Sequence, residues 1–298
     1  LKKLILDLRD NGGGVLTGAT EIADLFLSAG KPIVETKGEN SPLQTYYATE
    51  KSPLIDVDLV LLINLETASA SEILAGAIQD NDRGLVIGRR SFGKGLVQED
   101  KQLNDGSNLR LTIARYYTPT GRCIQKPYSG DYDSYNQDII NRYENGEMYL
   151  IDSSQFIDSL KFITPKGRVV YGGGGIMPDI FVPYETLGVS SFYSELRSLN
   201  AFRTFVFNYV KDKRNKWSSP QQFNEEFNVT SSLLNTFLNF IKLNYKLEKQ
   251  IKKNQASRDL IAQRMKAEIA SQIWGEQGFY QVINTENEDI KEAMKAFN

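Results

Sequence analysis

The alternation of short apolar runs with helical segments near the start of the chain constrains its fold most strongly. Three apolar runs rich in branched residues predict buried strands, at 4–8, 57–64 and 84–88. Apolar residues at helical spacing predict two helices, over 17–27 and 69–79. Strand, helix and strand in this order form the unit of an α/β domain, so the sequence predicts an α/β core.

The pattern changes further along the chain. Alternating β-forming residues predict a strand over 109–117, and the Tyr-, Asp-, Asn- and Ser-rich stretch 127–160 reads as a polar surface insertion. From about Phe192 onward proline nearly vanishes and helical spacing takes over. We therefore expect a core domain over 1–190 and a mainly α-helical region over 191–298.

Composition excludes several classes of chemistry. The chain of 298 residues has no histidine, which rules out Ser-His-Asp and Cys-His machinery and His-ligated zinc within it. The net charge of −2 gives no reason to expect a nucleic-acid or anionic-membrane partner. Cys123 is the single cysteine and cannot form an internal disulfide, and no apolar run is long enough for a transmembrane segment. Because Leu1 leads directly into a strand pattern, we expect a fragment or a processed product.

A junction of small residues, Glu66 to Glu72, precedes the apolar helical run Ile73 to Ile78. A serine there has its hydroxyl at the positive end of the helix dipole, where a following backbone N–H could stabilise an oxyanion. The alternative is structural: Ser69 or Ser71 caps the helix, with Glu72 helping in the first turn.

Lys94 lies between two glycines in an otherwise apolar stretch flanked by strands. A desolvated lysine loses its proton more easily and can act as a general base, although a lysine in a surface turn is the simpler interpretation. With no histidine available, lysine is the remaining base for a serine nucleophile. Gln98 follows four residues later, so in a strand both side chains would share one face and Gln98 could orient the amine.

Four stretches together resemble the C-terminal processing peptidases, also called tail-specific proteases: LILDLRDNGGG at 4–14, SASEILAGAIQDNDRGLVIGRRSFGKGLVQ at 69–98, LTIARYYTPTGR at 111–122 and GGGIMPDIFVP at 173–183. The resemblance implies a core of the ClpP and crotonase type. It also implies that the PDZ domain and the first part of the family's core would precede this chain.

The resemblance assigns three catalytic roles. Ser69 matches the nucleophile, Lys94 the general base and Gln98 the residue that orients the base. It implies a serine endopeptidase that cleaves protein or peptide substrates near their C-termini through an acyl-enzyme. No metal or cofactor is implied.

The resemblance also implies an oxyanion hole of backbone N–H groups. One belongs to Ala70 and the other to a glycine of the loop that ends the first strand, with Gly13 favoured and Gly14 left open. Gly12 stands where family members often have proline. The family setting is extracytoplasmic, in the periplasm or at the envelope, and a homo-oligomer is an open alternative.

Two other classes of function compete with this interpretation. Residues 88–94 satisfy Gly-x4-Gly-Lys, the start of a phosphate-binding P-loop, but Gly95 stands where Ser or Thr would hold magnesium. The second alternative is a catalytically silent scaffold of the same fold that binds peptides by strand addition.

Overall fold

The computed structural model describes the chain except for residues 129, 131, 151–157, 186–188, 248–256 and 298. It divides into two compact units, one of Leu1–Tyr184 with Glu292–Asn298 and one of Glu185–Lys291. Each is described by itself below. That 1–190 and 191–298 act as separate functional domains stays a prediction.

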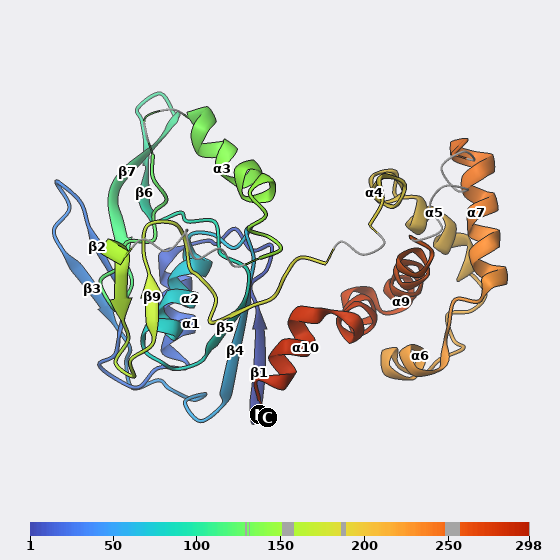
Figure 1. Ribbon diagram of the computed structural model, residues 1–298, viewed down its shortest axis with the longest axis horizontal. Helices are drawn as coiled ribbons and strands as arrows, with labels where there is room; N and C mark the ends of the chain where they lie inside the picture. The colour runs from blue at the N-terminus through green and yellow to red at the C-terminus, as the bar shows by residue number, and fades with distance from the viewer. Residues whose placement is uncertain (129, 131, 151–157, 186–188, 248–256, 298) are drawn as a thin grey trace. The chain divides into compact units, whose positions relative to one another are not determined.

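A parallel sheet of four strands forms one layer of the first unit (Figure 1). Its strands, in spatial order, are β1 (Lys3–Asp7), β4 (Asp58–Ile63), β5 (Leu85–Gly88) and β10 (Ile180–Phe181). Every residue of β4 after Asp58 is buried, as expected for a parallel strand covered on both faces. The three predicted strands at 4–8, 57–64 and 84–88 are confirmed.

A second, antiparallel sheet has the strand order β3, β2, β7, β6. Its strands are β2 (Pro32–Lys37), β3 (Gln44–Tyr47), β6 (Leu96–Gln102) and β7 (Asn108–Tyr117). The prediction of a strand over 109–117 is confirmed by β7. The sequence analysis missed β2 and β3, which are short. A small hairpin completes the strands of this unit, β8 (Lys161–Ile163) with β9 (Val169–Tyr171).

Two helices, α1 (Leu16–Asp24) and α2 (Ala70–Asp80), lie between these sheets (Figure 1). One hydrophobic cluster joins both helices to both sheets, with Ile78 of α2 and Leu61 of β4 fully buried within it. Every residue of α2 is buried. A helix enclosed on all sides must satisfy its polar groups internally, which explains the dense hydrogen bonding at both of its ends.

Most described residues of the segment 127–160 are exposed, as expected for a polar surface insertion, and its residues 129, 131 and 151–157 lie outside the described residues. It contains the helix α3 (Tyr132–Glu144), and Arg142, Glu147 and Met148 are buried. The composition gave no sign of this buried part, in which Arg142 and Glu147 are paired inside the protein.

The second unit is helical, which confirms the predicted C-terminal region. Its helices are α4 (Ser191–Ser198), α5 (Ala201–Tyr209), α6 (Pro220–Glu226), α7 (Ser231–Tyr245) and α9 (Arg258–Ile283), and α10 (Glu288–Lys295) begins within it. They enclose a separate hydrophobic cluster that includes Phe202, Phe223 and Phe237. Among the described residues, no helix is long and apolar enough to cross a membrane.

Candidate active site

Ser69 lies in a strained turn between β4 and α2. Its backbone has φ 56 and ψ −119, a conformation that residues other than glycine rarely adopt. The turn is held by a hydrogen bond from Ser69 N to Glu72 Oε2 at 2.8 Å and one from Ala68 N to Asn11 O at 3.0 Å. Ser69 therefore occupies the N-cap of α2, as the capping interpretation expected. The cap and the nucleophile interpretations are compatible, because the residue is half-buried and lines a cavity.

The glycine loop after β1 packs against this turn. Gly13 has φ 91, and a Cβ atom there would approach Ala68 O to 2.5 Å and Ala70 N to 2.7 Å, so only glycine fits. Its N–H donates to Asn11 Oδ1 at 3.0 Å. Gly14 lines the same cavity as Ser69 and Ala70. The loop thus brings backbone N–H groups beside the serine, and the choice between Gly13 and Gly14 as oxyanion donor stays open.

Lys94 is half-buried in the loop between β5 and β6. Tight packing explains its two glycine neighbours: a Cβ atom on Gly93 would meet Gly175 N at 3.0 Å, and one on Gly95 would meet Gln125 N at 2.8 Å. The N–H groups that a P-loop would direct to phosphate, those of Gly93 and Lys94, donate instead to the Glu72 carboxylate. Since β6 follows in place of a helix, the structure does not support the nucleotide-binding alternative.

Glu72 connects the serine turn to the lysine loop, a role that sequence analysis missed. Its side chain is fully buried and accepts four hydrogen bonds: from Ser69 N at 2.8 Å, Ser91 Oγ at 2.5 Å, Gly93 N at 2.7 Å and Lys94 N at 2.8 Å. Burial raises the pKa of Glu72, and these hydrogen bonds act in the opposite direction. A glutamate at the start of an otherwise apolar helix was the available signal, but its partners lie up to 22 residues away.

Tyr116 of β7 provides a second connection. Its buried hydroxyl is within hydrogen-bond distance of the carbonyl oxygens of Ser69, at 3.0 Å, and of Lys94. A phenol has one proton, so the two carbonyls share a single donor. Burial raises the pKa of Tyr116 well above its ordinary value, which keeps the phenol protonated and able to donate.

One cavity of about 400 Å³ brings the predicted residues Ser69, Ala70, Lys94 and Gln98 together. Gln98 was expected to share one face of a strand with Lys94, and this expectation is wrong. Because β6 begins at Leu96 and its pairing with β7 shifts register between Val97 and Gln98, strand alternation does not relate Gln98 to Lys94. Gln98 is exposed, and its Nε2 lies 3.4 Å from Thr112 Oγ1.

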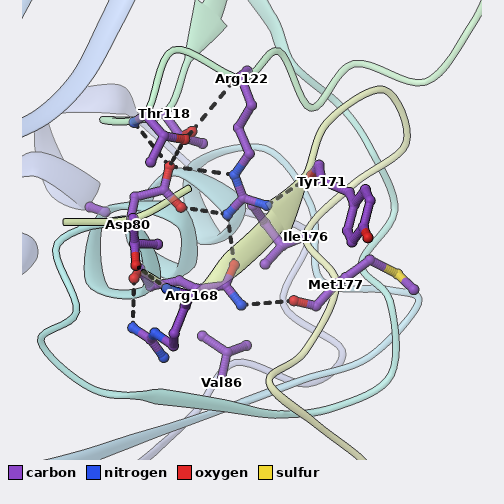
Figure 2. Close-up of polar contacts among 12 residues, drawn as sticks. Asp80, Val86, Thr118, Arg122, Arg168, Tyr171, Ile176 and Met177 are labelled. Atoms are coloured by element: carbon purple, nitrogen blue, oxygen red, sulfur yellow. Dashed lines mark hydrogen bonds and ion pairs between the residues drawn. The ribbon is translucent and has the colours of Figure 1, made fainter. Parts of the chain in front are cut away.

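The opposite end of α2 is fixed by a buried charge network (Figure 2). Arg122 Nη2 donates to Asp80 Oδ1 at 2.7 Å, and both side chains are fully buried. Arg122 also donates to Gln79 Oε1 at 2.6 Å and to Tyr171 O at 2.8 Å. Arg168 donates to Gln79 O at 2.7 Å, so cations cover the negative end of the helix dipole.

Two of the four stretches that carry the family resemblance, 111–122 and 173–183, contribute residues to this network. Thr118 and Arg122 come from the stretch 111–122, and Met177 and Asp179 come from 173–183. Gln79 Nε2 donates to Met177 O at 2.9 Å and to Asp179 Oδ1 at 3.0 Å. These residues position the helix that carries Ser69 rather than lining the cavity.

In the part of the chain that the structure describes, no group of three or more acidic or cysteine side chains is placed to hold a metal ion. The cavity beside Ser69 has a mixed lining, with apolar side chains of Leu16, Ile73 and Leu96 and charged side chains of Asp100 and Arg110. The arrangement places a serine hydroxyl, an amine and backbone N–H groups around one space, which is suited to acyl transfer.

Comparisons with known proteins find similarity to peptidases. Residues 1–133 match the model of peptidase family S41, and residues 192–275 match a family of unknown function (DUF8443). The chain is 43% identical over 115 residues to carboxyl-terminal-processing peptidase 1, chloroplastic, of Arabidopsis thaliana, covering 39% of this chain and 24% of that protein. It is 46% identical over 124 residues to the carboxyl-terminal-processing protease of a Picosynechococcus species, covering 42% of this chain and 30% of that protein.

Among solved structures, the photosystem II D1 C-terminal processing protease is similar, with 42% identity, a TM-score of 0.39, and 42% of this chain and 32% of that one covered. The matched part of the chain thus spans about a quarter to a third of the length of these three relatives. On the matched sequence, residues 1–133 of this chain are similar to peptidase family S41.

Proposed function

We propose that this chain carries the catalytic centre of a serine endopeptidase that cleaves protein or peptide substrates near their C-termini. The observation that supports this most directly is the single cavity lined by Ser69, Ala70 and Lys94, whose backbones are connected through Glu72 and Tyr116. The names of the relatives, carboxyl-terminal-processing proteases, support the C-terminal preference.

The proposed reaction uses residues of this chain alone. Ser69 Oγ attacks the scissile carbonyl carbon, and the neutral amine of Lys94 takes the hydroxyl proton. The Ala70 N–H, together with an N–H of Gly13 or Gly14, stabilises the oxyanion of the tetrahedral intermediate. The Lys94 ammonium then returns the proton to the leaving amine, and water hydrolyses the acyl-enzyme with Lys94 again as base. Gln98 is proposed to orient the Lys94 amine when substrate closes the cavity.

Reaction with a fluorophosphonate probe tests this proposal. Wild-type protein should be labelled at Ser69 and should cleave a peptide library at sites near the C-terminus, with EDTA leaving the rate unchanged. Ser69→Ala should do neither. A wild-type protein that binds peptides but is neither labelled nor cleaves them would show a silent scaffold instead.

We further propose that 1–190 is the peptidase core, that 191–298 is a separate helical domain, and that the protein works outside the cytoplasm, in the periplasm or at the envelope. The resemblance to the processing peptidases supports these proposals. Fractionation of the full-length protein tests the location, since recovery from the cytosol would contradict it.

A further inference from the structure

The helix α3 of the segment 127–160 packs against the loop that carries Lys94. Its Arg142 side chain is 2% exposed, donates from Nη1 to Ser91 O at 2.7 Å, and has Nη2 at 3.3 Å from Phe92 O. Its Nε lies 3.1 Å from Asp138 Oδ2 of the same helix. Arg142 lies beyond residue 133, where the match to the peptidase family model ends. We propose that Arg142 is a positioning residue for Lys94, an inference that rests on the proposed function.

The peptide units of the lysine loop are rigid planes. A trans peptide directs its C=O and its N–H in opposite directions, so holding both groups fixes the orientation of the whole plane. In the unit that joins Phe92 to Gly93, the C=O faces the Arg142 guanidinium and the N–H donates to Glu72 at 2.7 Å. A cation and an acidic side chain therefore hold this plane from opposite ends.

The neighbouring planes are held in the same way. In the unit before it, Ser91 O accepts from Arg142 and Phe92 N donates to Thr67 O at 2.9 Å. In the unit after it, Gly93 O accepts from Lys126 N at 2.9 Å and Lys94 N donates to Glu72. Three consecutive peptide planes are thus held at both their C=O and their N–H. Arg142 contacts the C=O group of the first two planes.

The contacts around Lys126 show that α3 is built onto this loop. The Lys126 ammonium lies 4.1 Å from the ring centroids of both Phe92 and Tyr135, and it donates to Tyr135 O at 3.0 Å. Next to it, Arg90 forms a two-pronged ion pair with Glu147, at 2.5 and 2.6 Å. The segment therefore contributes Arg142, Asp138 and Glu147 to the contacts behind the lysine loop, and none of the three lines the cavity beside Ser69.

If Arg142 is lost, the plane between Phe92 and Gly93 keeps only its Glu72 contact and can rotate. The unit that leads into the Gly93–Lys94 plane then loses its support on the Arg142 side, so the Lys94 stem can shift relative to Ser69, while the cavity walls at Leu16 and Ile73 stay in place. A misplacement of about 1 Å can lower turnover by roughly a hundredfold, so the effect should fall on kcat rather than on KM.

The test uses the full chain and compares Arg142→Ala with Asn141→Ala, a change at the adjacent exposed position of the same helix. We expect Arg142→Ala to lower kcat by roughly tenfold or more, with KM within about twofold of wild type. Added guanidinium should restore much of the loss by occupying the vacated site. Asn141→Ala should keep wild-type kcat, and guanidinium should not raise it.

A folded Arg142→Ala protein with wild-type kcat would overturn the inference, and so would a loss that guanidinium does not restore. If Arg142→Ala does not fold, Arg142→Lys tests the inference instead. Lysine keeps the positive charge, but its ammonium lacks the planar fork that contacts two carbonyls. A several-fold lower kcat with unchanged KM then supports the inference, and wild-type kcat overturns it. If the proposed function itself is wrong, the wild-type protein will neither react with fluorophosphonate nor cleave peptide. That result differs from the outcomes above, and it would also overturn the inference about Arg142.

Discussion

Ser69 has a backbone conformation that costs free energy for any residue with a Cβ atom. At φ 56 and ψ −119, glycine is the residue that fits without strain, and such strain costs about 1–3 kcal/mol. The hydrogen bond to Glu72 and the close packing of Gly13 hold the turn in place. The serine at this position is therefore better explained by its hydroxyl than by the needs of the turn.

The strain at Ser69 makes a prediction about stability. We expect Ser69→Gly to be more stable than Ser69→Ala by about 1 kcal/mol, because glycine relieves the strain and alanine does not. Both variants should lack peptidase activity. Urea unfolding of the matched pair measures the difference, and equal midpoints would show that the turn is not strained.

Lys94→Arg tests the base directly. The guanidinium stays protonated and cannot accept the serine proton, so we expect turnover to fall by roughly a hundredfold or more. Lys94→Ala should lose activity to a similar extent, because both changes remove a neutral amine. Kinetics on a cleavable peptide check this, and near-normal turnover of Lys94→Arg would exclude Lys94 as the base.

Glu72 predicts a pH dependence of stability. Burial raises its pKa above the ordinary value of 4.5, so the folded protein keeps a proton that the unfolded chain releases. The contribution of Glu72 to the free energy of unfolding is thus complete below pH 4.5 and is lost as pH rises through the folded-state pKa. Urea unfolding at several pH values measures the difference in the free energy of unfolding between wild type and Glu72→Gln. This difference, wild type minus variant, should fall as pH rises. A difference that stays constant or grows would contradict the sign.

At the scale of the element, α2 connects the serine turn to the buried charge network. Ser69 is its N-cap, Glu72 lies in its first turn, and its last turn is held by Arg122 and Arg168. Helix stability here comes from burial and from fixed ends rather than from exposed capping groups.

The buried pair of Asp80 and Arg122 should be the costliest of these contacts to break. We expect Arg122→Met to lower the free energy of unfolding by about 3–5 kcal/mol, because it leaves a fully buried carboxylate without its main cation. The matched control is Arg110→Met, which breaks the exposed pair with Asp100 and should change stability little. Similar effects from both variants would show that burial does not set the cost.

The elements that could be predicted from sequence are those with strong local patterns. The continuous apolar runs of β4 and β5 and the apolar spacing of α1 and α2 are visible within single windows. The roles of Glu72, Tyr116 and Arg142 could not be predicted, because each depends on partners far away along the chain. The burial of Arg142 and Glu147 within the segment 127–160 could not be predicted for the same reason, since the composition gives no sign that these side chains find partners inside the protein.

At the scale of the molecule, the described residues form two hydrophobic clusters, one in each compact unit. We expect two unfolding transitions in calorimetry. Ile78→Ala should shift one of them and Phe237→Ala the other, since each removes a fully buried side chain worth about 2–5 kcal/mol. A single transition that both variants shift equally would show that the clusters unfold as one cooperative unit.

The fixed ends of α2 also limit how this gene can change in length. One residue inserted between Ser69 and Asp80 would turn one end of the helix by about 100° relative to the other and lengthen it by about 1.5 Å, so the hydroxyl and the charge network could not both keep their places. The tip of the hairpin between β6 and β7 is exposed and carries no such constraint. Insertions and deletions should therefore accumulate at that tip, while the interval from Ser69 to Asp80 keeps a constant number of residues.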